Sequence, residues 1–248
     1  MENDAPGLAF WLESDSQKAC EIARRAGFDI VIFDMEHGVL DELALDRLVP
    51  FCAQLGLTPY VRVSEATQPR IQTALDIGAR GVILPQIKDL QHAAQVVCFA
   101  KFPPLGLRGL GYSRTMSYGS PDNEFIAREN RDRLCFAMIE TPGALAAAGG
   151  IAELACVDGL FIGPSDLSLT RGRGVFIGLE ADVDDLKVIA NAARSVGKKW
   201  AAAAAHPRYR MHALSLKPHI LAIADDLSAM YAGFRALRGD VPSGMELP

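Results

Sequence analysis

The chain alternates along its length between short apolar runs and longer segments whose apolar residues recur at helical spacing. The apolar runs are the strand candidates, at residues 8–12, 29–35, 58–63, 80–85, 134–140, 158–163, 199–205 and 219–224. Most of these runs lack the alternation of a half-exposed strand. Continuous apolar runs are typical of strands buried on both faces, as in a parallel sheet covered by helices. The rhythm therefore predicts an α/β protein with a parallel sheet.

Helical patterns separate these runs, at residues 15–26, 41–55, 68–77, 88–101, 183–196 and 225–238. The first of them has Ser14 or Asp15 as a capping residue and stops before Gly27, as helices commonly do. Eight strands alternating with helices over about 250 residues predict a (β/α)8 TIM barrel. We expect it to form one domain over residues 1–248. A doubly wound open sheet is the competing fold, but it uses fewer strands and no GxGxxG follows the first strand.

Composition excludes several classes of protein. Half of the chain is hydrophobic and 22% is charged, which is a globular rather than a disordered composition. The net charge of -5 provides no basic field for a phosphate backbone, so we expect no nucleic-acid partner. The five cysteines are widely spaced without a CxxC pair, which indicates a reducing compartment. No secretory signal or membrane-spanning run is present, and we expect a cytoplasmic protein with no membrane partner.

Polar residues gather where the predicted strands end, which is where a barrel of this kind carries its active site. Charged side chains at several points of one rim are not needed for barrel stability. The residues concerned are Asp34, Glu36, His37, Arg62, Gln86, Glu140, Ser165 and Asp166.

Glu140 and Asp166 follow neighbouring strands and could together hold a hard divalent cation, with water and substrate oxygens completing its shell. Mg²⁺ or Mn²⁺ is favoured over zinc because no thiolate or multi-histidine set accompanies them. Such an ion can act as a Lewis acid on a carbonyl. The alternative is that the two carboxylates cap helices that begin near Pro142 and Leu167.

His37 stands beside Asp34 and Glu36 and could serve as a general base near neutral pH. A helix-entry histidine bonded to a backbone carbonyl is the alternative. Arg62 lies in an otherwise apolar strand, so its guanidinium needs an anion. That anion could be a substrate carboxylate, Asp34 or Glu140.

Segment 103–132 is too long for a plain connection, and we expect a functional excursion before the fifth strand. Its glycines, with Arg108 and Arg114, could form a flexible basic loop over an acidic substrate. A tight structural passage is equally compatible with this composition.

Six stretches together resemble the HpcH/HpaI family of metal-dependent (class II) pyruvate aldolases, which is related to the citrate lyase β subunit. In order, they are FDMEHG at 33–38, YVRV at 60–63, LDIGARGVILPQI at 75–87, FPPLGLRGLGYSR at 102–114, MIET at 138–141 and VDGLFIGPSDLSL at 157–169. The GPSDLS and PPxGxRG strings are specific as a pair, and the resemblance spans most of the chain.

The resemblance implies a (β/α)8 barrel that assembles as a hexamer, a trimer of dimers with a swapped C-terminal helix at about 225–238. It implies that Glu140 and Asp166 bind Mg²⁺, Mn²⁺ or Co²⁺. It implies that Arg62 contacts the carboxylate and carbonyl oxygen of pyruvate, and that the main-chain N–H groups of Ser165 and Asp166 contact the same carboxylate.

The resemblance also implies that His37 is the catalytic histidine and that Asp34 and Asp76 support it, although the plain interpretation of Asp76 is a helix-end carboxylate. The implied activity forms or cleaves 4-hydroxy-2-oxo acids through pyruvate and an aldehyde. Met138 departs from the family, where glutamine is common near the substrate carbonyl, and Met35 stands where glycine is common.

Two alternatives remain open from the sequence. The first is a citrate-lyase-like acyl-CoA lyase on the same barrel, for which Arg171 and Arg173 offer basic groups. The second is a non-catalytic oligomer that binds a metal or an oxo acid.

Overall fold

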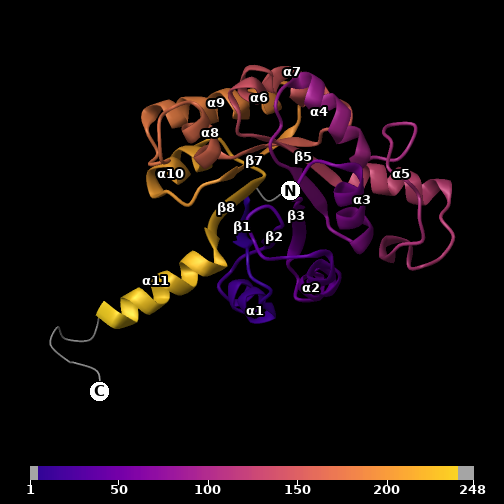
Figure 1. Ribbon diagram of the computed structural model, residues 1–248, viewed down its shortest axis with the longest axis horizontal. Helices are drawn as coiled ribbons and strands as arrows, with labels where there is room; N and C mark the ends of the chain where they lie inside the picture. Colours follow the sequence, from indigo (N-terminus) through magenta and orange to yellow (C-terminus); the bar gives the residue numbers. More distant parts are fainter. Residues whose placement is uncertain (1–4, 240–248) are drawn as a thin grey trace.

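Eight parallel strands close into a barrel in the order of the sequence, from β1 to β8, and helices surround it (Figure 1). The computed structural model describes residues 5–239; residues 1–4 and 240–248 of the predicted domain lie outside the described residues. The strands are β1 Gly7–Leu12, β2 Ile30–Asp34, β3 Thr58–Arg62, β4 Gly81–Leu84, β5 Leu134–Ile139, β6 Gly159–Ile162, β7 Lys199–Ala203 and β8 Ile220–Asp225. The predicted (β/α)8 fold and all eight strand positions are confirmed.

The helices are α1 Gln17–Arg25, α2 Glu42–Gln54, α3 Gln68–Ile77, α4 Leu90–Val97, α5 Asn123–Asp132, α6 Pro142–Ala146, α7 Ala148–Glu153, α8 Pro164–Thr170, α9 Glu180–Ser195, α10 Pro207–Ser215 and α11 Asp226–Gly239. Side-chain caps start several of them: Ser16 accepts from the Ala19 N–H and Asp41 from the Ala44 N–H. The helical patterns did not include α5, α6, α7, α8 or α10; α6, α7 and α8 have seven residues or fewer, and α5 is largely polar. None of the helices in residues 5–239 is long and apolar enough to cross a membrane.

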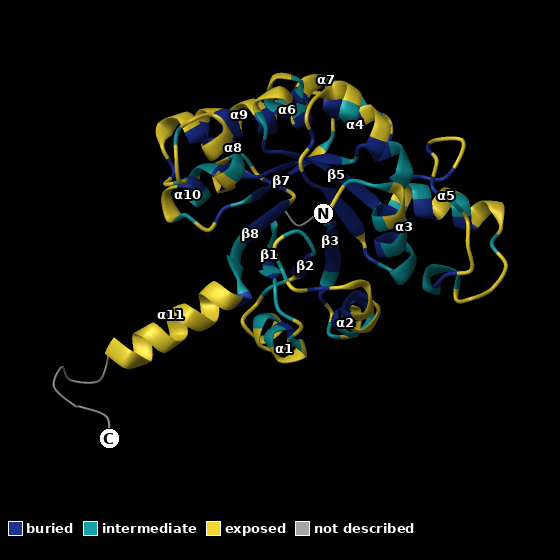
Figure 2. Ribbon diagram, in the orientation of Figure 1, coloured by how far each residue is buried: buried dark blue, intermediate teal, exposed yellow. Residues whose placement is uncertain are grey.

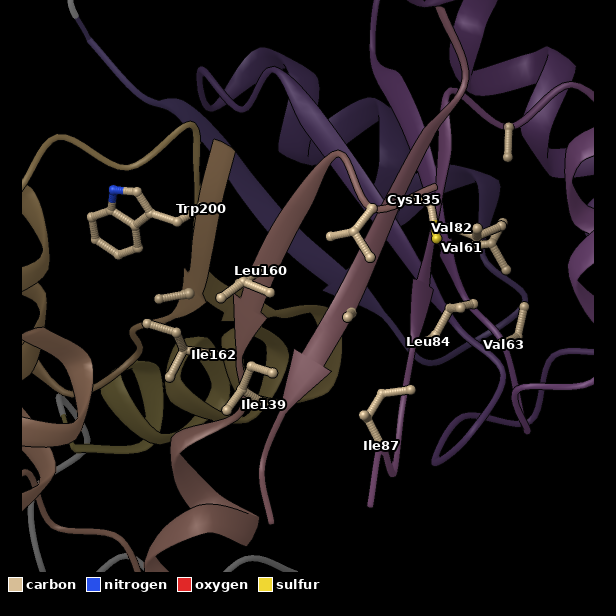
Figure 3. Packing of buried hydrophobic residues seen from close by; sticks show 14 of the residues in the cluster. Val61, Val63, Val82, Leu84, Ile87, Cys135, Ile139, Leu160, Ile162 and Trp200 are labelled. Atoms are coloured by element: carbon tan, nitrogen blue, oxygen red, sulfur yellow. The ribbon is translucent and has the colours of Figure 1, made fainter. Parts of the chain in front are cut away.

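Side chains on each strand alternate between the barrel interior and the layer beneath the helices. On β5, Phe136 and Met138 face the interior cluster, whereas Cys135 and Ile139 join the larger outer cluster. Figure 3 shows part of that outer cluster along β3 to β7. Because both faces of the sheet are buried, each strand is a continuous run of apolar residues in the sequence. This is why the strand positions could be predicted well.

The 103–132 excursion begins and ends at the end of the barrel where the strands start, and between these points it lies against α3, where the Gln72 side chain accepts from the Gly109 N–H. Arg108 is buried and pairs with Asp76 and Glu129. Arg114 pairs with Asp46. Of the two alternatives from the sequence, these ion pairs support the structural passage, because both arginines are bound to carboxylates of the chain itself.

Lys101 anchors the start of this excursion. Its ammonium is fully buried, donates to the carbonyl oxygens of Asn130 and Arg133 at 2.8 and 2.6 Å, and pairs with Asp158 at 2.7 Å. A buried ammonium persists only when its donors are satisfied in this way.

We expect Lys101→Met to destabilise the protein by about 3 kcal/mol, because it leaves two carbonyl groups without this donor and leaves Asp158 with the Cys135 N–H but no cation. Lys187→Met is the matched control. That lysine forms exposed ion pairs with Asp184 and Glu180, and its loss should cost less than about 0.5 kcal/mol. Urea unfolding of both variants measures the difference, and equal midpoints would contradict the anchoring role.

Candidate functional site

Three charged side chains enter the barrel mouth because they occupy interior positions at or just after strand ends. Asp34 ends β2, Arg62 ends β3 and Glu140 directly follows β5. Asp34 and Arg62 are register partners across the β2–β3 pair. The parallel sheet thus brings together residues that are far apart in the chain, as predicted from the strand ends.

Asp34 binds one edge of the Arg62 guanidinium through two hydrogen bonds. Arg62 Nε donates to Asp34 Oδ1 at 2.9 Å, and its Nη2 donates to Asp34 Oδ2. Arg62 also stacks on the Trp11 ring, with 4.6 Å between the guanidinium carbon and the ring centroid. Burial alone would lower the pKa of Arg62, but the Asp34 carboxylate, with Glu36 and Glu140, raises it above its ordinary value. The guanidinium is therefore fixed in orientation and permanently charged.

Glu36 and His37 occupy the turn after β2, and Asp34 also shapes this turn. Its Oδ1 accepts from the backbone N–H groups of Glu36 and His37 at 3.0 and 3.1 Å. His37 is exposed, with Nε2 4.0 Å from Glu36 Oε2. Asp34 thus acts on the His37 backbone, and the carboxylate beside the His37 ring belongs to Glu36.

Glu36 lies between Arg62 Nη1, at 3.4 Å, and the Gln86 side-chain amide, at 3.4 Å. Burial raises the pKa of Glu36; Arg62, His37 and Gln86 oppose that rise and Asp34 adds to it. Its Oε2 atom is buried without a hydrogen bond.

Glu140 is fully buried at the mouth. Its Oε1 accepts from the backbone N–H of Gln86 at 2.6 Å, while its Oε2 has no hydrogen-bond partner. Gln86 reaches this position with a φ of 55°, a left-handed conformation that is rare outside glycine. Burial, then Glu36 and Asp166, raise the pKa of Glu140 to about 7 against the opposing effects of the Gln86 N–H and Arg62. A buried carboxylate oxygen without a donor suits a cation.

Asp166 lies in the first turn of α8 and its charge reaches Glu140. Neither carboxylate is the cap of the helix that follows it: Thr141 caps α6, and α8 begins at Pro164. The amides of Ser165 and Asp166 precede the first α8 hydrogen bond, from Leu167 N–H to the Gly163 carbonyl, and are free of intrahelical partners.

Gly163 and Met138 border Glu140. A Cβ at Gly163 would approach Glu140 Oε2 and Met138 Cε to 2.7 Å each, so only glycine fits there. The Met138 side chain is buried, and its methyl group borders Gly163 as Glu140 Oε2 does.

Asp76 is the predicted site residue that one chain does not bring to the mouth. It lies near the end of α3, which precedes β4, and therefore at the opposite end of the barrel. Its carboxylate accepts from Arg108 at 2.7 Å. The prediction that it supports His37 is thus not met within one protomer, and the plain helix-end interpretation fits the contact.

Arg171 and Arg173 are the basic groups on which the acyl-CoA lyase alternative depends. Both form ion pairs with aspartates of α9. Arg171 bonds Asp185, and Arg173 contacts both Asp182 and Asp185 at 2.9 and 2.6 Å. These carboxylates offset the positive charge that the two arginines could offer to the phosphates of CoA.

Sequence reasoning missed Trp11, Glu13 and the role of the Gln86 backbone. Trp11 lies near the end of β1, and Glu13 follows directly after this strand, whose residues form an ordinary apolar run. The signal that could have found Glu13 is its position as the first charged residue after a strand. The positive φ of Gln86 has no signature in its residue type.

No three His, Cys, Asp or Glu side chains within residues 5–239 are arranged to hold a metal ion on their own. The predicted ligand set has two carboxylates, so substrate and water oxygens would have to complete it.

Comparison with known proteins identifies the family. The model of the HpcH/HpaI aldolase/citrate lyase family matches residues 8–198. A 2-keto-3-deoxy-L-rhamnonate aldolase of Salmonella gallinarum is 34% identical over 171 residues, which cover 66% of this chain and 62% of that protein. The matched region thus spans less than two thirds of this curated relative.

Solved structures agree on the fold. A HpcH/HpaI aldolase/citrate lyase family protein from Burkholderia cenocepacia shares 26% identity and superposes with a TM-score of 0.86, covering 96% of this chain and 95% of that one. A HpcH/HpaI aldolase from Desulfitobacterium hafniense, at 24% identity, superposes with a TM-score of 0.88 over 98% of this chain and 96% of that one.

The raised pKa of Glu140 predicts a pH-dependent stability of the metal-free protein. The pKa of Glu140 is 4.5 in the unfolded chain and about 7 in the folded chain, so ionisation of Glu140 favours unfolding. The free energy of unfolding therefore falls as pH rises between these two values. We expect Glu140→Gln to stabilise the metal-free protein by about 3 kcal/mol at pH 8 and by much less at pH 5. Urea unfolding in a chelator measures this. A gain that is equal at both pH values would contradict the assignment.

Proposed function

The chain belongs to the HpcH/HpaI aldolase/citrate lyase family, and on that premise we propose that it is a divalent-metal-dependent aldolase. It forms or cleaves 4-hydroxy-2-oxo acids, with pyruvate and an aldehyde as the two halves. The observation that carries the proposal is the fully buried Glu140 carboxylate, whose Oε2 lacks a donor beside Asp166 and an oriented Arg62.

Glu140 and Asp166 fit a divalent cation by their chemistry. Carboxylate oxygens are hard ligands, and Mg²⁺, Mn²⁺ and Co²⁺ all accept them. Glu140 Oε2 is buried without a partner and its pKa is raised to about 7, both of which a cation would relieve. When bound, such an ion would supply Lewis acidity toward the keto oxygen of pyruvate.

Arg62 binds the carboxylate end of pyruvate in this proposal. Asp34 occupies its Nε and Nη2 atoms, which leaves Nη1 directed toward Glu36 and the mouth. The free amides of Ser165 and Asp166 add two donors for the same carboxylate. Because Arg62 is fixed before substrate arrives, little side-chain entropy is lost on binding.

His37 handles the proton. In the synthetic direction the methyl carbon of pyruvate loses a proton and bonds to the aldehyde carbon, and the aldehyde oxygen gains a proton. His37 is exposed at the rim, close to Glu36 Oε2, and a neutral imidazole can both accept and return a proton near pH 7. Asp34 positions His37 through its backbone amide.

A pyruvate-release assay on the metal-stripped protein tests the activity. The panel contains 4-hydroxy-2-oxo acids, including 2-keto-3-deoxy-L-rhamnonate, with and without Mg²⁺, Mn²⁺ or Co²⁺. We expect release only with metal, and a loss of roughly 1000-fold in Glu140→Ala and Asp166→Ala, which remove the cation's ligands.

Glu153→Ala, which changes an exposed glutamate on α7, is the control and should retain wild-type activity. Full metal-requiring activity in Glu140→Ala would refute the ligand assignment. No pyruvate from any acid with any metal would favour the non-catalytic alternative instead.

We propose further that copies of the chain exchange their C-terminal helices, in the hexamer that the family resemblance implies. α11 projects away from the barrel and is exposed along nearly its whole length (Figures 1 and 2). Its large apolar side chains form one stripe at helical spacing: Leu227, Met230, Tyr231, Phe234 and Leu237, between 46% and 67% exposed. Unpaired apolar faces of this size indicate a partner.

A groove of about 450 Å³ beside the root of α11 offers a complementary surface. Its lining is mainly apolar and includes Phe10, Ala23, Phe28 and Ala224. It lies between α1 and the outer side of β1 and β8, where a helix folding back after β8 would pack in a regular barrel. Because α11 leaves this position, the proposed occupant is α11 of a second copy.

The variant Tyr231→Ser/Phe234→Ser/Leu237→Ser should lower the native mass, because it removes most of the exposed apolar stripe. Light scattering measures the mass of this variant, the wild type and the control Met211→Ser, which changes an exposed residue on α10. A triple variant with the wild-type mass would argue against helix exchange.

A further inference from the structure

Glu13 stands at the rim of the mouth, one residue beyond β1. Along β1, Ala9 and Trp11 face the barrel interior and Phe10 and Leu12 the outer layer. This alternation directs Glu13 to the interior side, above Trp11. Burial, then Asp225 and Asp34, raise the pKa of Glu13, and Arg62 opposes the rise, so its carboxylate lies within electrostatic reach of the proposed pyruvate site.

The Glu13 carboxylate is free to meet a ligand, since within residues 5–239 its oxygens make no hydrogen bond or ion pair. Its acidic neighbours Asp225 and Asp226, in contrast, accept hydrogen bonds from backbone N–H groups. Asp225 accepts from the Ser228 N–H at 2.6 Å, and Asp226 accepts from the Glu13 N–H at 3.0 Å. These bonds fix the β1 end against the start of α11.

Two strands on this side of the mouth carry small interior side chains, Ala203 on β7 and Ala222 on β8. Ala222 is in register with Ala9, and Asp225 is the register partner of Trp11. By contrast, the polar groups proposed to bind pyruvate come from β2, β3, β5 and the start of α8. The second substrate therefore has the β7–β8–β1 side on which to lie, with Glu13 as its free polar group.

Charge decides which second substrate can lie there. The three residues after each of these strands contain no lysine or arginine: they are Ala204, Ala205 and His206 after β7, Asp226, Leu227 and Ser228 after β8, and Glu13, Ser14 and Asp15 after β1. Arg62 is shared between Asp34 and the pyruvate carboxylate. Arg210 of α10 lies at the end of β7, but its Nε and Nη2 donate to the carbonyl oxygens of Ala204 and Ala205. A second carboxylate on this side would face Glu13 and Asp225.

We propose that Glu13 selects the acceptor, admitting neutral hydroxyaldehydes, whose hydroxyl donates a hydrogen bond to its carboxylate, and rejecting aldehydes that carry a carboxylate. This inference rests on the proposed aldolase function and adds its substrate class. Carboxylate acceptors form strong hydrogen bonds with hydroxyl donors, and like charges at close range repel.

Three two-carbon aldehydes separate charge from hydrogen bonding in the addition to pyruvate: acetaldehyde, glycolaldehyde and glyoxylate. We expect the wild type to use glycolaldehyde with a kcat/KM about tenfold above that for the other two. Glu13→Gln removes the charge but keeps an acceptor, and should raise the glyoxylate-to-glycolaldehyde ratio about tenfold. Glu13→Leu should abolish the preference for glycolaldehyde over acetaldehyde.

The control is Glu21→Gln, an exposed glutamate on α1, which should keep the wild-type ratios. Ratios within one variant are independent of how much enzyme is folded. Unchanged ratios in both Glu13 variants would overturn the selection role.

Exchange of the pyruvate methyl protons for deuterium, followed by NMR on the metal-loaded wild type without an aldehyde, tests the proposed function separately. Exchange together with unchanged Glu13 ratios overturns only the acceptor inference. Absence of exchange with every metal overturns both.

Discussion

The buried contact between Asp34 and Arg62 organises the mouth of the barrel. A guanidinium inside an apolar barrel is costly unless its donors are met, and Asp34 meets two of them in register across β2 and β3. The same carboxylate holds the turn that carries Glu36 and His37. The Asp34 side chain therefore fixes both Arg62, the proposed binding group for the pyruvate carboxylate, and His37, the proposed base. A change at Asp34 would disturb them together.

Acidic groups outnumber basic groups around the Asp34–Arg62 pair. Glu13, Glu36 and Glu140 all have raised pKa values, and burial is the leading cause for each. Arg62 is the cation that opposes all three. A cation between Glu140 and Asp166 and a hydrogen-bond donor at Glu13 would each relieve part of this excess. The acidity that attracts one substrate component also restricts the charge of the other.

Much of the fold and part of the site could be predicted from the sequence, because both depend on local patterns. Strands buried on two faces produce apolar runs, and parallel strands bring their carboxyl ends to one rim. These two facts located Asp34, Arg62 and Glu140. The role of Asp76 stays a prediction, because the start of β4, its neighbour in the sequence, lies at the far end of its own barrel. Residue type alone could not show that Gln86 would adopt a positive φ and donate its backbone N–H.

The two ends of the barrel use buried charge in opposite ways. At the end where the strands begin, Lys101 has three partners and Arg108 has two, so ionic groups there join the excursion to the barrel. At the rim, oxygen atoms of Glu36 and Glu140 are buried without hydrogen bonds. Unmet polar atoms cost stability, and folding alone would favour their removal. Buried polar atoms without a hydrogen bond also occur away from the rim, for example Arg108 Nε and Trp200 Nε1. Glu140 Oε2 differs from these because it belongs to a buried acid beside a second carboxylate, where this fold places its chemistry, and a bound cation would meet it.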